Sequence, residues 1–412
     1  MIDVKVLSKC CGCEACVLAC PQHCISFKED EEGFLYPEVN KEKCVECGVC
    51  ENVCPILNQG DKRVPISVHA AMNLNEAVRI GSSSGGIFIL LAELTIKKEG
   101  VVFGAAFNDR WEVWHSYAQS IKDCEKYKGS KYVQSRIGDS YKKAEEFLKN
   151  GRLVLFSGTP CQISGLKRYL RHEYDNLLTV DVICHGVPSP GMFRWYLYEE
   201  MQKVNCQGDG KNSVSFRPIH SIPKRDALKG VNGVEIKDIS FRDKSKGWKK
   251  YSFALDLAKA TADGKQNTVS LSYTQDKNPF MKGFLRNLYL RPSCYDCPVR
   301  ELKSGSDITL GDFWGIGRVL PSMDDDKGVS AVLLNTEKGA RYFNELDVEK
   351  VLTNYDVIRR YNNVIWKNPA KPKKRKLMFC GEDGFIERVN RLAKPSLKIL
   401  LKKIIKTIIG RK

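Results

Sequence analysis

The chain has 412 residues, enough for two or three domains, and its hydrophobic content of 42% is ordinary for a globular protein. Its 17 cysteines are far above the usual number, and the first twenty residues lack the charged and apolar regions of a secretory signal. No apolar run approaches the ~18 residues that span a membrane. These features exclude a disulfide-built secreted protein and predict a cytoplasmic one whose thiols serve metal or redox chemistry.

The formal net charge of +17 is unevenly distributed along the chain. Residues 1–60 hold five Lys against ten Asp or Glu, whereas residues 367–412 hold fifteen Lys or Arg against three acidic residues. Such asymmetry indicates that separate surfaces serve separate partners.

One cysteine pattern, C-x2-C-x2-C-x3-C-P, occurs at residues 10–21 and again at 44–55 without deviation. It is typical of two-cluster bacterial ferredoxins, in which three cysteines of one motif bind a 4Fe–4S cubane and the fourth reaches the other cluster. A pair of zinc sites is the alternative, but zinc ligands come as two separated pairs. The predicted ligands are Cys10, Cys13, Cys16 and Cys54 for the first cluster and Cys44, Cys47, Cys50 and Cys20 for the second.

Two further thiols in this region, Cys11 and Cys24, fall outside the pattern and are interpreted as spare. Between the motifs, residues 24–44 read as a strand, an acidic turn and a second strand. We therefore predict an α+β, ferredoxin-like two-cluster domain over residues 1–58, followed by an exposed linker at 59–68.

Residues 69–350 alternate apolar strand-like runs with helical patterns, which is typical of an α/β domain. We divide this domain into an N-terminal part, 69–148, and a C-terminal part, 149–320. The predicted strands are 101–107, 152–158, 177–184 and 307–313, and the predicted helices include 85–100 and 161–174.

Four more cysteines lie where these predicted elements end. Thr159 suits an N-cap and Pro160 the first helical position, so Cys161 falls in a first turn, where the helix dipole favours a thiolate. Cys184 ends the next strand, and the carboxyl ends of parallel strands share one side of a sheet. With the C-x2-C pair Cys294 and Cys297, these thiols could hold a third cubane. The alternative is two ordinary buried cysteines plus a small zinc or redox unit.

A Gly- and Ser-rich run, "RIGSSSGGIFILLAEL" at 79–94, opens an apolar helix. Free amides and hydroxyls near a helix start suit a phosphate, although a serine-capped packing helix explains the run equally well. The dinucleotide fingerprint G-x-G-x-x-G is absent. A second glycine-containing segment, "KGSKYVQS" at 128–135, adds Lys131 and Tyr132, which suit a phosphate or ring contact.

Seven motifs in one order carry a family resemblance: "GSSSGGIF", "KGSKYVQS", "LFSGTPCQ", "VDVICHGVPSP", "SFRDKSKGW", "YLRPSCYDCPV" and "DITLGDFWG". Over residues 70 to about 320 the chain resembles the iron–sulfur flavoproteins related to the beta subunit of coenzyme F-420 (deazaflavin) hydrogenase and dehydrogenase. Plant-type 7-hydroxymethyl chlorophyll reductases look similar in this core.

The resemblance implies an α/β flavin- and iron–sulfur-binding domain behind the ferredoxin-like one, with FAD beside a further 4Fe–4S cluster. It implies that this cluster is held by Cys161, Cys184, Cys294 and Cys297. The residues that it implies for the flavin site are Ser83, Ser84, Gly85, Gly86, Lys131, Tyr132 and Gln134.

The cofactor types suggest an oxidoreductase that relays single electrons from the ferredoxin clusters through the inner cluster to FAD, and on to a small substrate or a deazaflavin coenzyme. The expected partners are a redox carrier, ferredoxin or deazaflavin coenzyme, and a small-molecule substrate, with no nucleic acid. The alternative is a non-catalytic electron-transfer subunit that serves a separate redox enzyme. His185 could donate a proton, or could simply pack beside Cys184. Asp181, Asp312 and Trp314 are interpreted as structural.

Residues 367–412 are predicted to be a basic tail that ends in an amphipathic helix. Apolar residues from Leu397 to Ile408 form one helical stripe, with Lys398, Lys402, Lys403 and Lys406 largely opposite. Such a helix could lie on an anionic membrane surface, which would place the protein at the inner membrane face. The alternative is that its apolar side packs on the body.

Overall fold

The computed structural model describes residues 2, 8–206, 218–229, 231, 233–260 and 266–394. Its N-terminal module contains a short helix α1 (Ala15–Leu18), strands β1 (Ile25–Glu29) and β2 (Leu35–Val39), and a short helix α2 (Val49–Asn52). The two strands pair antiparallel, and the Asp30 carboxylate accepts the amides of Glu32 and Phe34 in the turn between them. The hairpin predicted between the cysteine motifs is thereby confirmed.

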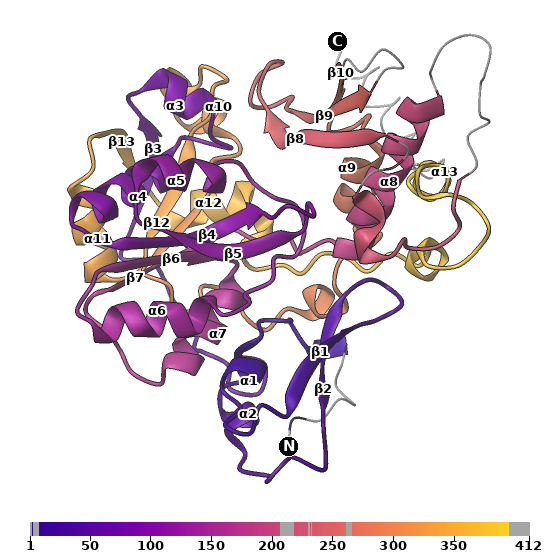
Figure 1. Cartoon of the computed structure of the whole chain (residues 1–412). Helices are drawn as coiled ribbons and strands as arrows, with labels where there is room; N and C mark the ends of the chain where they lie inside the picture. Colours follow the sequence, from indigo (N-terminus) through magenta and orange to yellow (C-terminus); the bar gives the residue numbers. More distant parts are fainter. Residues whose placement is uncertain are drawn as a thin grey trace.

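The body is built on an eight-stranded mixed sheet of order β13-β3-β12-β11-β7-β6-β4-β5 (Figure 1). Four central strands run parallel: β4 (Val101–Phe107), β6 (Val154–Gly158), β7 (Leu177–Val182) and β11 (Ile308–Asp312). Antiparallel strands flank them: β5 (Val113–Ala118) on one side, and β12 (Ser330–Leu334), β3 (Ser67–Asn73) and β13 (Val348–Thr353) on the other.

Alternation along the central strands decides which helices cover which face. In β4, Val102 packs with α4 (Ile87–Lys97), α5 (Ile121–Cys124) and α11 (Glu337–Asn344), since successive side chains point to opposite faces. Its neighbours Val101 and Phe103 pack on α6 (Ser140–Lys149) and α7 (Pro160–Leu170). The N-terminal module lies against α7, on the far side of this helix layer from the sheet (Figure 1).

Shorter helices complete the body. Beside β3 and β12 lie α10 (Ile316–Val319) and α12 (Tyr355–Tyr361), while α3 (Glu76–Ile80) follows β3. The predicted strand 101–107 matches β4, and the strands predicted at 152–158, 177–184 and 307–313 correspond to β6, β7 and β11 with ends shifted by one or two residues. The helix predicted from 161 begins at Pro160 and is capped by Thr159, as expected. The predicted linker at 59–68 loses its last two residues to β3.

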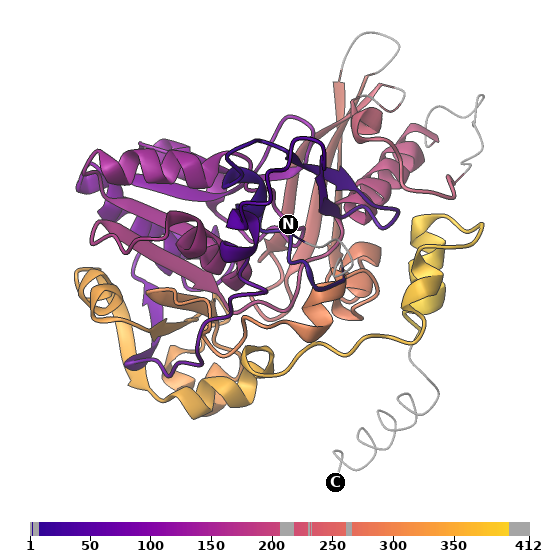
Figure 2. The ribbon, with the colours of Figure 1, turned by 90° about the horizontal axis from the view of Figure 1, so that it is seen from below.

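A second sheet, which the sequence patterns did not indicate, forms a separate layer. Its strands, β8 (Val234–Asp243), β9 (Ser252–Ala260) and β10 (Gln266–Thr274), are antiparallel. Against it pack α8 (Pro190–Cys206) and α9 (Pro279–Leu285), and α13 (Phe385–Leu392) packs on these two helices. Together they enclose an aromatic core that includes Trp195, Phe241, Phe280 and Phe385 (Figures 1 and 2).

The segment predicted as a basic tail is partly structured. Residues 375–378 form a 3₁₀ turn, and both this turn and α13 contribute buried side chains, among them Met378 and Val389, to the aromatic core. The amphipathic helix predicted beyond residue 394 lies outside the described residues. Among the helices that the structure describes, none has the length and apolar character to cross a bilayer.

The buried ring of His115 in β5 makes the stability of this fold depend on pH. Its Nε2 lies 3.0 Å from the carbonyl oxygen of Ser157, and burial lowers its pKa from 6.5 to about 4. Because the unfolded chain binds this proton more readily, the free energy of unfolding should rise by about 3 kcal/mol as pH increases from about 4 to 6.5.

His115→Gln, which keeps a hydrogen-bond donor but does not titrate, should flatten this part of the stability curve in urea unfolding at several pH values. His172→Gln, at an exposed position, is the matched control and should leave the curve unchanged. An unaltered slope in the His115 variant would contradict the assignment.

Candidate iron–sulfur and flavin sites

A cysteine-lined cavity lies at the carboxyl ends of β6 and β7 and measures about 710 Å³, including its open mouth. The parallel strands β6 and β7 bring Cys161 and Cys184 to this edge. Cys161 occupies the first turn of α7, whose Thr159 and Gln162 form a reciprocal cap, and the Thr159 hydroxyl lies 3.2 Å from its sulfur. The four cysteines predicted to hold a third cluster all line this inner cavity: Cys161, Cys184, Cys294 and Cys297.

The electrostatics of the inner cavity suit iron. Burial, reinforced by Cys294 and Cys161, raises the pKa of the Cys184 thiol, and burial together with Cys297 raises the pKa of Cys294 to about 12. Such thiols become thiolates only when a bound cation stabilises the ionised form. Within the described residues, no three His, Cys, Asp or Glu side chains converge closely enough for a single metal ion. The thiols instead surround a space, and the donor set fits a 4Fe–4S cluster.

Cys11, expected to be spare, also lines the inner cavity. It is buried and packs with Cys13 of the first motif and with Cys161. Cys11 therefore lies between the first motif and the inner cavity. In the sequence, Cys11 was marked only by its position directly after Cys10, and the motif spacing did not indicate a role for it.

The second cysteine motif surrounds a smaller cavity of about 340 Å³. The residues predicted to hold the second cluster all line it: Cys20, Cys44, Cys47 and Cys50. Cys20 is thus carried across from the first motif, as the crossed ferredoxin arrangement requires. Cys24 lines the same cavity, with its sulfur 3.4 Å from that of Cys20, so it too lies beside predicted ligands. Cys47 is exposed.

The other predicted set gathers at α1. Burial, followed by the thiols of Cys10 and Cys54, raises the pKa of Cys16, and α1, which carries Cys16, packs against α2. Cys13 faces α7 at Gly165, where a Cβ atom would lie 2.9 Å from the Cys13 Cβ. A glycine at this helix position therefore permits the close approach of the first motif to the body.

Polar contacts fasten the module to the body beside these thiols. The Glu14 carboxylate accepts the amides of Ile137 at 3.0 Å and Gly138 at 3.3 Å. Gln134, predicted to line the flavin site, instead donates its side-chain amide to the carbonyl of Cys11 at 3.0 Å. Arg291 contacts the same segment. The structure thus places Gln134 at the module boundary.

Two of the other residues predicted for the flavin site meet at Arg242 of β8. The Arg242 guanidinium pairs with both carboxylate oxygens of Asp312 and donates to the Tyr132 hydroxyl and to the carbonyl of Ser83. Arg242 is itself buried. The motif "SFRDKSKGW" contained this arginine, but its spacing carried no indication that it would join the two segments.

The Gly- and Ser-rich run packs on the loop that precedes β12. The Ser84 hydroxyl donates to the carbonyl of Val329, and the Gly85 amide donates to the hydroxyl of Ser330. Gly85 has no room for a side chain, because a Cβ atom would lie 2.4 Å from the carbonyl oxygen of Ala71. Gly86, with a φ of 79°, is the N-cap of α4.

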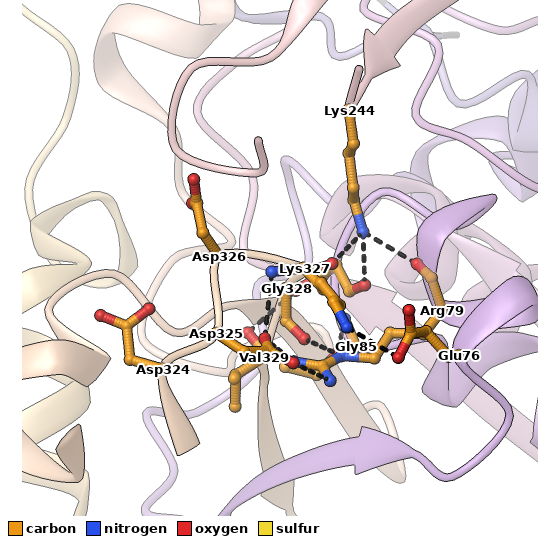
Figure 3. A network of polar contacts seen from close by, with 12 residues as sticks. Glu76, Arg79, Gly85, Lys244, Asp324, Asp325, Asp326, Lys327, Gly328 and Val329 are labelled. Carbon is orange, nitrogen blue, oxygen red and sulfur yellow. Dashed lines mark hydrogen bonds and ion pairs between the residues drawn. The ribbon is translucent and has the colours of Figure 1, made fainter. Parts of the chain in front are cut away.

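Lys244 closes this junction from the end of β8, as Figure 3 shows. Its ammonium donates to the carbonyls of Arg79, Ser84 and Lys327, and burial lowers its pKa to about 7. Arg79 in turn pairs with Asp325 (Figure 3). The Lys244 side chain therefore ties the end of β8 to the Arg79–Ser84 segment and to the loop at Lys327.

The remaining predicted residues have local partners. Lys131 donates to the carbonyls of Lys126 and Lys128, and burial lowers its pKa to about 7. The His185 ring lies 2.7 Å from the Asn287 amide oxygen. The two carboxylates interpreted as structural are held in networks: Asp181 by Ser304 and Thr309, and Asp312 by Arg242 and Trp248. Trp314 stacks on Trp248.

Comparison with known proteins identifies both parts of the chain. The profile of the 4Fe-4S dicluster domain matches residues 9–57, so the chain is an iron–sulfur electron-transfer protein. The profile of the carboxyl-terminal part of coenzyme F420 hydrogenase/dehydrogenase beta subunits matches residues 151–358. The chain belongs to this family of hydrogenase/dehydrogenase beta subunits, as the sequence motifs predicted.

Several individual proteins are similar. The F subunit of F(420)H(2) dehydrogenase from Methanosarcina mazei is 23% identical over 240 residues, which cover 53% of this chain and 68% of that protein. The VorC subunit of ketoisovalerate oxidoreductase from Methanothermobacter marburgensis is 40% identical over 52 residues, covering 12% of this chain and 66% of that one. A chain of the F420-reducing NiFe hydrogenase complex from Methanosarcina barkeri is 17% identical, with a TM-score of 0.44 over 74% of this chain and 91% of that chain.

Proposed function

We propose that the chain is an iron–sulfur flavoprotein oxidoreductase that connects two ferredoxin-type 4Fe–4S clusters, through a third cluster in the inner cavity, to FAD. Cys161, Cys184, Cys294 and Cys297 would hold the third cluster. The clusters would supply one-electron transfer and FAD two-electron chemistry, which suits a deazaflavin coenzyme or another small hydride-accepting substrate. One observation carries the proposal: Cys11 of the first motif lines the inner cavity together with Cys161, and Cys11, Cys13 and Cys161 pack in one cluster.

The arrangement of the cysteine motifs supports an order of the clusters along the relay. The second motif is the outer one, since Cys47 is exposed there. The first motif is the inner one, because Cys13 packs on Gly165 of α7 and Cys11 lines the inner cavity. A redox carrier would therefore exchange electrons near Cys47, and the first motif would face the body.

For the flavin, the supporting feature is the junction around Arg242 and Lys244, which unites the Ser83 and Tyr132 segments. A buried arginine, Arg242, whose Nε has no hydrogen-bond partner in the described residues, beside a Gly- and Ser-rich helix start suits the phosphates of a dinucleotide. Among the residues that the family resemblance implies, Ser83, Ser84 and Tyr132 are the ones that we assign to this site.

A second candidate function is electron transfer without catalysis, by a chain that serves a separate redox enzyme. It is favoured by the names of two relatives, since the M. mazei protein is named as part of a dehydrogenase and the Methanothermobacter protein as part of an oxidoreductase. Stable copurification with another redox protein, and no turnover in its absence, would select this candidate.

Anaerobic purification with iron, sulfide and flavin quantification tests the main proposal. We expect about twelve irons and one FAD per chain, because three cubanes hold four irons each. About eight irons without flavin would contradict the inner cluster and the flavin, and would leave a ferredoxin module fused to a body of another function.

A further inference from the structure

Arg291 is a buried cation at the boundary between the N-terminal module and the body. Arg291 is only 1% exposed and directly precedes the 3₁₀ turn (Pro292–Asp296) that carries Cys294. Its Nε donates to the carbonyl of Cys10 at 2.6 Å, and one terminal nitrogen donates to the carbonyl of Leu35 at 2.9 Å. The other terminal nitrogen donates to the Gln134 side chain.

No carboxylate forms an ion pair with the guanidinium in the described part of the chain, and Asp30 attracts it only from farther away. Most other buried arginines form an ion pair: Arg242 pairs with Asp312, Arg79 with Asp325, and Arg375 with Glu32. Arg388 is also buried, and it donates to backbone carbonyls instead. An unpaired buried charge costs several kcal/mol unless hydrogen bonds, aromatic faces or an opposite charge offset it, so a nearby negative charge would stabilise Arg291.

What faces Arg291 is sulfur and aromatic carbon. One terminal nitrogen lies 3.7 Å from the Cys10 sulfur. The guanidinium lies 4.2 Å from the ring centre of Tyr36, a cation–π contact that offsets only part of the cost of burial. The missing negative charge is therefore expected on the Cys10 side.

We propose that Arg291 is the counter-charge of the 4Fe–4S cluster held through Cys10, and that it raises the reduction potential of this cluster. The inference rests on the proposed iron–sulfur function and adds a positioning residue to it. A cubane with four thiolates is negatively charged and gains one more negative charge on reduction, so a fixed cation nearby favours the reduced form. Low exposure makes this effect larger than it would be in water.

The neighbouring glycine supports a built contact. Gly12 has a φ of 69°, and a Cβ atom there would lie 2.9 Å from the guanidinium carbon and 2.6 Å from the Gln134 amide nitrogen. Only glycine lets the first motif close over the cation at this distance.

The test compares three variants of the full chain, purified without air: Arg291→Gln, Arg291→Lys and Arg375→Gln. The last removes another buried arginine at the module boundary, one that pairs with Glu32 and donates to the carbonyl of Leu290. Iron is quantified first, and redox titrations followed by electron paramagnetic resonance then give the potential of each cluster.

We expect Arg291→Gln to keep its iron and to lower the potential of one cluster so that its reduction equilibrium changes at least tenfold, about 59 mV for a one-electron couple. Arg291→Lys should change the reduction equilibrium of this cluster less than threefold, because the positive charge remains. Arg375→Gln should leave every potential unchanged.

The inference would be overturned if the reduction equilibrium of every cluster in Arg291→Gln stayed within threefold of its value in the unmodified protein. It would also be overturned if Arg375→Gln shifted a potential as much as Arg291→Gln does. If Arg291→Gln fails to hold iron, Arg291→Lys decides: a nearly unaltered potential supports the charge role, and loss of the same cluster despite the retained charge overturns it. Failure of the proposed function is distinguishable, because it appears as missing iron or flavin in the unmodified protein.

Discussion

Cys161→Ser is expected to lower the iron content of the anaerobically purified protein from about twelve to about eight atoms per chain. The Cys161 sulfur lines the inner cavity, in the first turn of a helix whose cap is formed by Thr159 and Gln162. A serine hydroxyl is a harder and less acidic ligand than a thiol, so the third cubane would lack one corner. The clusters of the N-terminal module use other cysteines and should remain.

Iron and sulfide quantification with electron paramagnetic resonance measures this loss. Cys124→Ser is the matched control, since Cys124 is a fully buried thiol packed in the apolar layer of α4 and α5. It should keep about twelve irons. A Cys161 variant that also keeps about twelve would show that this thiol holds no cluster.

Asp312→Ala should lower the free energy of unfolding by about 3–5 kcal/mol, since it breaks a buried ion pair and leaves one charge without a partner. Asp312 accepts from both terminal nitrogens of Arg242, at 2.9 and 3.1 Å, and from the Trp248 indole at 2.8 Å. The Arg242 side chain is 2% exposed, so water cannot replace the carboxylate. The loss should appear as a lower urea midpoint.

Two further variants separate the buried pair from general charge effects. Glu38→Ala removes an exposed pair with Lys28, and should cost less than about 1 kcal/mol. Asp312→Ala combined with Arg242→Leu should recover part of the loss, because no buried charge is then left unpaired. A single Asp312 variant as stable as the Glu38 variant would refute the expectation.

Local sequence was informative where a short motif is sufficient for a structural role. The repeated cysteine spacing identified the dicluster domain, because three ligands of each ferredoxin cubane lie on one tight loop. The strand at 101–107 and the cap at Thr159 and Pro160 were equally local, and both appear as β4 and the start of α7. Family membership followed from ordered motifs, each of them short.

Only the tertiary structure decided which distant residues meet. Cys11 was an extra thiol until folding placed it between Cys13 and Cys161, and Arg291 became a boundary residue through contacts with a segment 281 positions earlier. Likewise β8–β10 and α13 form one core although more than a hundred residues separate parts of it. The amino-acid sequence alone determined the cysteine loops and the alternation of strands and helices, since both depend on neighbours a few residues apart. Burial and charge pairing between modules depend on packing across the whole chain, which no local periodicity encodes.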